Sequence, residues 1–140
     1  MGKISEKSMK KISKYIVDTN VIVRYLLQDN EKLFKESKIF FDKVKSGTIK
    51  AYIEQTVFTE TIYVLSSVYA VPRREISEVL SDILMYKGML NNDLDLLKGS
   101  LKIYENTNLH IVDSLICYKA RKNDLQIMTY DEELKKIYKK

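Results

Sequence analysis

Short apolar runs that alternate with longer segments of helical periodicity constrain the fold of this chain more than any other feature. The run YIV at residues 15–17 is short and ends in small polar residues, which is typical of a buried strand. Longer segments place apolar residues three or four positions apart, as Ile76, Val79, Leu80 and Ile83 do. Strands separated by helices predict an α/β domain whose parallel sheet is covered on both sides.

The same patterns give approximate bounds for each element. The predicted strands are residues 15–17, 49–53, 88–90 and 125–128. The predicted helices are residues 21–27, 33–44, 56–69, 74–86, 93–104, 112–122 and 132–138. One Pro and four Gly leave little room for linkers, and 45% of the 140 residues are hydrophobic. We therefore expect a single domain with a substantial core over residues 15–140.

The charge of the chain is concentrated at its beginning. Residues 1–14 hold five Lys and one Glu, a net charge of +4, out of +5 for the whole chain. The other 126 residues carry 19 basic and 18 acidic side chains and are almost neutral. We interpret residues 1–14 as a basic, flexible leader that adds weak attraction to phosphates without specificity.

Three absences in the sequence narrow its cellular setting. Cys117 is the only cysteine, so an intrachain disulfide or a thiolate metal cluster cannot form. No stretch approaches the roughly 18 uncharged apolar residues that a membrane span needs. The N-terminus also lacks the apolar region of a secretory signal. These features favour a cytoplasmic protein without a membrane segment.

Four acidic residues stand where a solvated carboxylate is not the obvious choice. Asp18 follows the first predicted strand, where it is either a turn former or a ligand at the end of the strand. Glu60 is flanked on its helix by Val57 and Val64, and it either enters the core or reaches water from the edge of this apolar stripe.

The other two acids lie in the last third of the chain. Asp113 is close to a helix start, where a cap and a ligand role are equally compatible with the pattern. Asp131 follows the last predicted strand and precedes the last helix, so it is either an N-cap or a ligand. Thr129 stands two residues earlier, near the end of the last predicted strand, where it could face the same crevice.

Asp18 and Asp131 follow predicted strands and Glu60 and Asp113 lie on the apolar sides of predicted helices, so we expect the four carboxylates to converge. A parallel sheet brings the carboxyl ends of its strands to one edge. Carboxylates that converge there repel one another unless a proton or a cation neutralises them. Oxygen ligands suit hard cations such as Mg²⁺ or Mn²⁺, and such a site serves phosphodiester chemistry.

The arrangement of these segments resembles the PIN-domain ribonucleases, specifically the VapC-type toxins of prokaryotic toxin–antitoxin pairs. The matching segments are YIVDTNVIVRYLL, VFTETIYVLSSVY with PRREISEVL, and VDSLICYKARKNDLQIMTYDEEL. They follow the order and spacing of the family over nearly the whole chain. The family's acidic quartet falls on Asp18, Glu60, Asp113 and Asp131, its amide on Asn20 and its hydroxyl on Thr129.

The resemblance implies an α/β/α sandwich and an endoribonuclease that depends on Mg²⁺ or Mn²⁺. It also implies a homodimer and a small antitoxin protein that covers the active site. One departure is His110, which stands where many relatives carry a further Asp. A lone His is more often structural than functional.

Two other functions remain open at this point. The first is a catalytically silent module of the same fold that binds RNA or another protein. The second is a DNA nuclease related to 5′-nucleases, which the chain fits less well because it lacks the additional helices and loops with which such enzymes grip duplex junctions. Retention of all four acids favours the ribonuclease.

Overall fold

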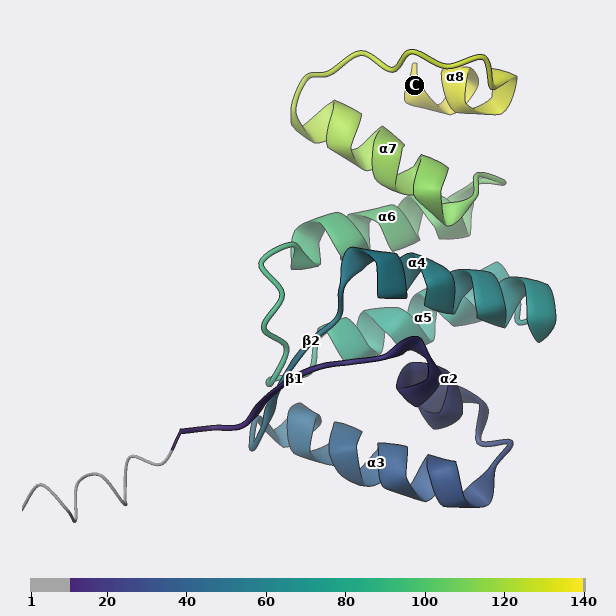
Figure 1. Cartoon of the computed structure of the whole chain (residues 1–140). Coiled ribbons are helices and arrows are strands. Elements are labelled where there is room, and N and C mark those ends of the chain that lie inside the picture. The colour runs from purple at the N-terminus through teal and green to yellow at the C-terminus, as the bar shows by residue number, and fades with distance from the viewer. Residues whose placement is uncertain (1–10, 140) are drawn as a thin grey trace, which may run out of the picture.

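Two parallel strands and the helices around them form the frame of the molecule (Figure 1). The structure is a computed structural model, and it describes residues 11–139. Strand β1 (Lys14–Ile16) pairs with β2 (Lys50–Tyr52), with Lys14 opposite Lys50 and Ile16 opposite Tyr52. The helices are α2 (Thr19–Leu27), α3 (Glu31–Ser46), α4 (Gln55–Tyr63), the π-helix η1 (Val64–Val68), α5 (Arg73–Leu84), α6 (Leu94–Asn106), α7 (Ile111–Lys122) and α8 (Glu132–Tyr138).

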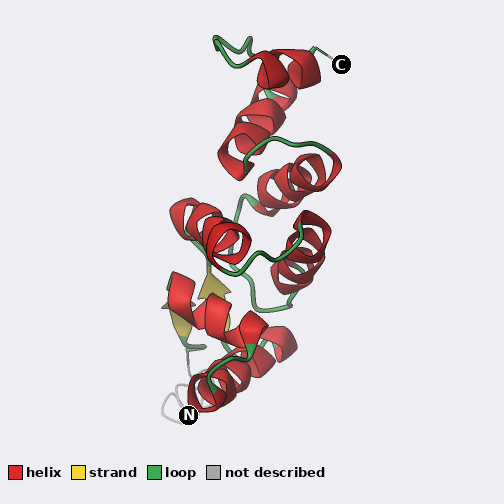
Figure 2. Cartoon of the chain, turned by 90° about the vertical axis from the view of Figure 1, so that its right-hand side faces the viewer, coloured by secondary structure: helices red, strands yellow, loops and turns green. Residues whose placement is uncertain are grey.

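The α/β class and the parallel direction of the strands are as predicted. The helices stack along one long axis, with α3 and the strands toward one end and α7 and α8 at the other (Figures 1 and 2). The sheet of the described residues has two strands, fewer than the sequence predicts. Residues 1–10 of the predicted leader lie outside the described residues, and Lys14, its last residue, begins β1.

The predicted strand at residues 88–90 is reduced to one bridge between Met89 and Ala51. Ala51 donates its N–H to Gly88 O at 2.9 Å, and Leu90 donates to Ala51 O at 2.8 Å. A Cβ atom at Gly88 would lie only 2.3 Å from the carbonyl oxygen of Ile49. Glycine is therefore needed for this segment to approach β2 so closely.

The side chain of Asn91 extends this contact along β2. Its Oδ1 accepts from the N–H of Ile53 at 3.0 Å, and its Nδ2 donates to Ile53 O at 2.7 Å. The amide thus takes the place of a backbone peptide and covers the outer edge of β2 near its end.

The prediction of a strand at residues 125–128 is wrong for this structure, which has a loop there. A strand needs a hydrogen-bonded neighbour, and no described strand lies beside this segment. The loop follows a turn in which Asp124 has a φ of 53°, and Leu125 donates its N–H to Ala120 O at 2.8 Å. These contacts hold the beginning of the segment against α7, away from β1.

The long helix predicted at residues 56–69 is present, but its second half is wider than an α-helix. Residues Val64–Val68 form the π-helix η1 directly after α4. The helix ends at Val68, and Ala70 then adopts a left-handed backbone conformation with a φ of 53°. Pro72 follows as the N-cap residue of α5.

Two clusters of buried side chains hold the helices together. The main cluster extends from Val17 in the strand region to Leu115 in α7 and includes Phe41 and Phe58. The second cluster has Leu109, Cys117 and Leu134 as its buried members. Burial raises the pKa of the Cys117 thiol.

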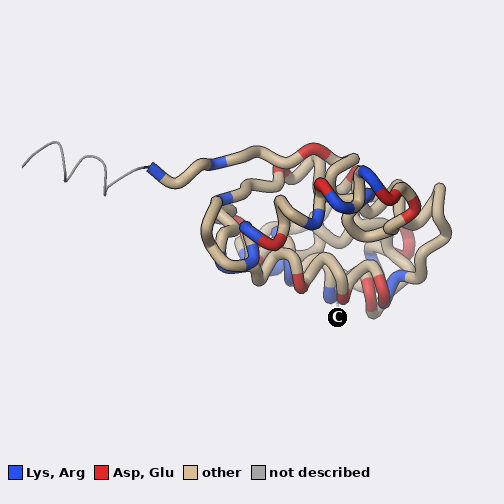
Figure 3. The backbone as a smooth tube through the Cα atoms, turned by 90° about the horizontal axis from the view of Figure 1, so that it is seen from below, with Lys and Arg blue, Asp and Glu red and all other residues tan. Residues whose placement is uncertain are grey.

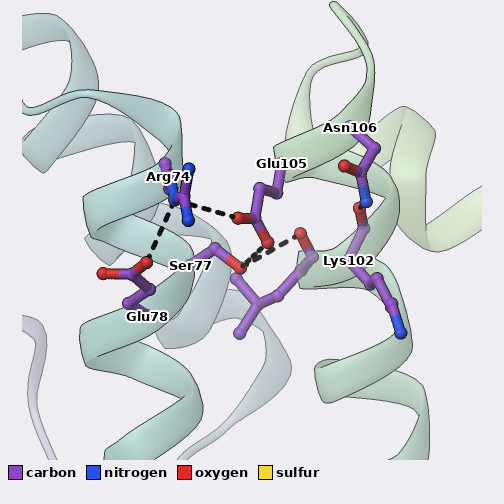
Figure 4. A network of polar contacts seen from close by, with 7 residues as sticks. Arg74, Ser77, Glu78, Lys102, Glu105 and Asn106 are labelled. Atoms are coloured by element: carbon purple, nitrogen blue, oxygen red, sulfur yellow. Dashed lines mark hydrogen bonds and ion pairs between the residues drawn. The ribbon is translucent and has the colours of Figure 1, made fainter.

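Polar contacts add to the packing of α5 against α6 (Figure 4). Arg74 Nε lies 3.2 Å from Glu78 Oε1 and 3.9 Å from Glu105 Oε1. Ser77 Oγ donates to Leu101 O at 3.3 Å. Because Arg74 is exposed, its ion pairs contribute little to stability.

Charged residues of both signs are interspersed over the helices, in agreement with the near neutrality of residues 15–140 (Figure 3). None of the helices within residues 11–139 is both long and apolar enough to cross a membrane.

Candidate active site

Asp18 lies where β1 passes into α2, at the carboxyl end of the sheet. It is the N-cap residue of α2, with extended backbone dihedrals, and its carbonyl oxygen accepts from Val21 N at 3.1 Å. Its side chain makes no capping hydrogen bond and is exposed. Asp18 therefore follows β1 as the sequence predicts, and its carboxylate is exposed to solvent.

Glu54 occupies the equivalent place after β2, and sequence reasoning missed it. Ile16 pairs with Tyr52, so Asp18 and Glu54 each stand two residues beyond the same paired position. Glu54 is the N-cap residue of α4 without a side-chain cap bond, and its Oε2 is buried without a partner. A buried carboxylate oxygen without a donor in the protein can accept a hydrogen bond from a bound molecule. The sequence feature that could have identified Glu54 is its position between a predicted strand and a predicted helix.

Thr19 and Asn20 differ in their surroundings although they are neighbours in α2. Thr19 is 7% exposed, and its hydroxyl is buried without a hydrogen-bond partner. Asn20 is exposed and lines a groove of about 470 Å³ together with Asp18. The groove runs beside β1, and its walls include Ile16 and Phe40.

Glu60 and Asp113 are carried by two helices that contact one another, α4 and α7. Glu60 is exposed, so it reaches water from the edge of its apolar stripe rather than entering the core. Asp113 is half-buried in the first turn of α7. His110, just before this helix, is exposed and makes no capping bond with its side chain.

Asp131 has the capping role that its sequence position allowed. Its Oδ1 accepts from Leu134 N at 2.9 Å at the start of α8. Thr129 Oγ1 accepts from Asp131 N at 3.0 Å, so these two residues form one local turn. Asp131 itself is exposed, and its second carboxylate oxygen is not used by the cap.

The structure thus distributes the four predicted acids over the long axis of the molecule. Asp18 lies beside the strands, whereas Asp131 lies in the connection between α7 and α8 at the other end (Figure 1). Within residues 11–139, no three His, Cys, Asp or Glu side chains are close enough together to hold a metal ion. The donors themselves are oxygen atoms, which fits Mg²⁺ or Mn²⁺.

A larger cavity of about 1060 Å³ lies elsewhere, between α6, α7 and α8. Its lining includes Arg73, Lys102, Arg121 and Lys122 and two acidic residues, but none of the four predicted acids. Its mixed charge and its distance from the strand ends separate it from the candidate active site.

Comparisons with known proteins agree with the sequence resemblance. The family model described as "PIN domain" matches residues 15–140. A protein named VapC ribonuclease, from Aquifex aeolicus (strain VF5), is 25% identical over 124 residues, which covers 87% of this chain and 90% of that protein. No solved structure gave a significant match.

Proposed function

Because the chain belongs to the PIN-domain family and is of VapC type, we propose that it is a divalent-metal-dependent endoribonuclease and the toxin of a toxin–antitoxin pair. The observation that carries the proposal is Asp18, which combines a family position with an uncapped, exposed carboxylate at the end of β1. A carboxylate that served only to cap α2 would accept a hydrogen bond from the helix, and this one does not.

In this proposal Asp18, Glu60, Asp113 and Asp131 would hold Mg²⁺ or Mn²⁺, directly or through water, which requires that they come closer together than they are in the described chain. When bound, the ion activates water for attack on the phosphodiester and neutralises charge that develops on the leaving oxygen. Asn20 and Thr129 orient the ligands or the scissile phosphate. Thr129 is suited to this role because its hydroxyl already contacts the backbone of Asp131.

The proposed partners follow from the VapC-type family. The substrate is single-stranded or structured RNA, a small antitoxin protein covers the active site, and the toxin acts as a homodimer in the cytoplasm. Large apolar side chains on the surface of α4, η1 and α7 are available for such contacts, among them Tyr63, Val68 and Val112.

Cleavage of RNA with and without EDTA tests the enzymatic proposal. We expect Asp18→Asn and Asp113→Asn each to abolish cleavage, because each removes a charged oxygen ligand. Asp42→Asn is the matched control, since Asp42 pairs with Lys38 on the surface of α3. Full activity in either site variant contradicts the proposed site.

A catalytically silent RNA-binding or interaction module is the alternative, and the separation of the acids in the described chain favours it. Titration with Mn²⁺ distinguishes the two functions. The nuclease binds Mn²⁺ saturably and loses this binding in Asp18→Asn. A module without a metal site shows no saturable binding.

A further inference from the structure

Two buried side-chain oxygen atoms lack a hydrogen-bond partner within residues 11–139, and both lie where a strand passes into a helix. One is Thr19 Oγ1, in the first residue of α2, and the other is Glu54 Oε2, in the N-cap residue of α4. Thr19 is only 7% exposed, and α2 contacts α4. Because buried polar atoms in folded proteins are generally bonded, this end of the sheet is suited to a polar or charged ligand.

The backbone holds Asp18 and Glu54 at matching positions beyond the paired strands. Val17, just before Asp18, donates its N–H to a carbonyl of β2 at 3.0 Å. Ile53, just before Glu54, has its N–H and its carbonyl bonded by the amide of Asn91. Val17 and Ile53 are both buried, and the backbone of the next residue is extended in each strand. Since side chains alternate along extended backbone, Asp18 and Glu54 lie together on the opposite face.

The chemistry of these groups favours a hard divalent cation. Two carboxylates on one face repel each other, and a cation between them removes this repulsion. Asp18, Thr19 and Glu54 offer only oxygen atoms, which are the ligands that Mg²⁺ and Mn²⁺ prefer. Mg²⁺ is often held by one or two carboxylates, while water and substrate phosphate fill its other positions. A pair of acids is therefore sufficient for binding, without Asp131 from the other end of the molecule.

We propose that Glu54 is a metal-binding residue, and that Asp18 and Glu54 hold one Mg²⁺ or Mn²⁺ at the ends of β1 and β2 before RNA is bound. The hydroxyl of Thr19 contacts this ion or its water. Glu54 lies outside the acidic quartet, and strand pairing rather than family position assigns its role. The use of the ion in RNA cleavage rests on the proposed function, whereas its binding does not.

Calorimetric titration of the full chain with Mn²⁺, in the absence of RNA, tests the pair. We expect saturable binding by the wild type. Glu54→Gln and Asp18→Asn should each raise the Kd by about tenfold or more, because a neutral amide of the same shape replaces a charged ligand. Glu75→Gln is the matched control, since Glu75 is an exposed acid in the first turn of α5. This control and Asp131→Asn should leave the Kd unchanged.

Thermal unfolding separates a ligand from a structural residue. Mn²⁺ that binds the folded chain raises the Tm of the wild type, and Glu54→Gln should lose most of this increase. In EDTA the Tm of Glu54→Gln should equal that of the wild type, because Glu54 Oε2 has no partner within the described chain. A clearly lower Tm in EDTA assigns Glu54 a structural role and overturns the proposal.

Thr19→Val tests the hydroxyl separately, because valine keeps the shape of the side chain. A raised Kd for Mn²⁺ with an unchanged Tm in EDTA supports contact of the hydroxyl with the ion or its water. An unchanged Kd rejects this contact.

The titration also distinguishes failure of the pair from failure of the proposed function. An unchanged Kd in Glu54→Gln overturns the pair, even where the wild type cleaves RNA and EDTA stops the cleavage. Loss of binding in Asp131→Asn contradicts a site formed by Asp18 and Glu54 alone, and so does a wild type without saturable binding. Binding that depends on Glu54 in a protein that cleaves no RNA supports the pair and rejects the proposed function.

Discussion

The two ends of the molecule differ in how firmly their elements are held. Around the strands, α2 to α6 share the main cluster, in which Phe41 and Phe58 are completely covered. At the other end, α8 rests on α7 through the second cluster, whose buried members are Leu109, Cys117 and Leu134. Since hydrophobic stabilisation scales with the buried apolar area, the second region is held by much less free energy.

Because of this difference, the candidate acids lie on secondary-structure elements of unequal stability. Asp18 and Glu54 are carried by strand ends that are continuous with the main cluster, whereas Asp131 is carried by a short helix with few buried contacts. Elements with few buried contacts are the ones that open and rearrange most easily. The four predictions below test this contrast.

The largest effect is expected for Phe41→Ala in the main cluster. Phe41 is fully buried and its ring stacks on Tyr25 at a centroid distance of 4.4 Å. Removing a buried phenyl ring lowers the free energy of unfolding by about 3–5 kcal/mol. Urea denaturation followed by circular dichroism measures this loss. A change below about 1 kcal/mol would show that the main cluster is not the stable part of the molecule.

Leu134→Ala is expected to loosen the second cluster while the rest of the fold persists. We expect the free energy that holds α8 against α7 to decrease by about 2 kcal/mol. Alkylation of Cys117 reports this opening, because the thiol is buried and its pKa is raised. We expect labelling to accelerate by about thirtyfold, which corresponds to that free energy. Equal acceleration in a surface variant such as Ile39→Ala would contradict local opening.

Asp131→Ala and Asp18→Ala form a matched pair of smaller effects. Asp131 accepts a capping bond from Leu134 N, so its loss destabilises α8 by about 1 kcal/mol. Asp18 makes no such bond with its side chain, so its loss leaves stability nearly unchanged. Thermal unfolding of both variants compares them directly. Destabilisation by Asp18→Ala would reveal a structural role for this carboxylate.

The smallest effect concerns the ion pair between Arg24 and Asp29 at the end of α2. Hydrogen bonds from Arg24 lower the pKa of the Asp29 carboxyl, and the shortest N–O distance is 2.7 Å. The pair therefore stabilises the fold above the ordinary carboxyl pKa, and this contribution is lost as the pH falls through the lowered pKa. Asp29→Asn should lower Tm slightly at pH 7 and leave it unchanged at pH 2. An equal decrease at both pH values would argue against the ion pair.

Local patterns were sufficient to predict most of the helices but not the extent of the sheet. The helical stripe of α5 and the predicted bounds of α8 agree with the structure, because period and capping act within a few residues. The strand at residues 125–128 was predicted from the same kind of pattern, but a strand also requires a partner, which sequence periodicity does not supply.

Prediction of the candidate site from the sequence is limited in the same way, because local patterns do not specify tertiary contacts. The position of Asp18 after a strand followed from the sequence, whereas the burial of Glu54 Oε2 results from tertiary packing, which a local pattern does not reveal. Glu60 was flanked by Val residues in the sequence, yet it is exposed because only one side of α4 faces the core. The convergence of the four acids at one site belongs to the proposed function, because local sequence patterns do not reveal which side chains meet in space.

The amide of Asn91 has a consequence for the way in which such molecules aggregate. A sheet with two open edges can recruit strands without end, as in fibrils. Here Asn91 and Met89 cover the outer side of β2, so growth is confined to the β1 side. Replacing Asn91 with a residue that cannot imitate a peptide would leave the N–H and C=O of Ile53 without this partner and open a second edge at which strands of other molecules can add.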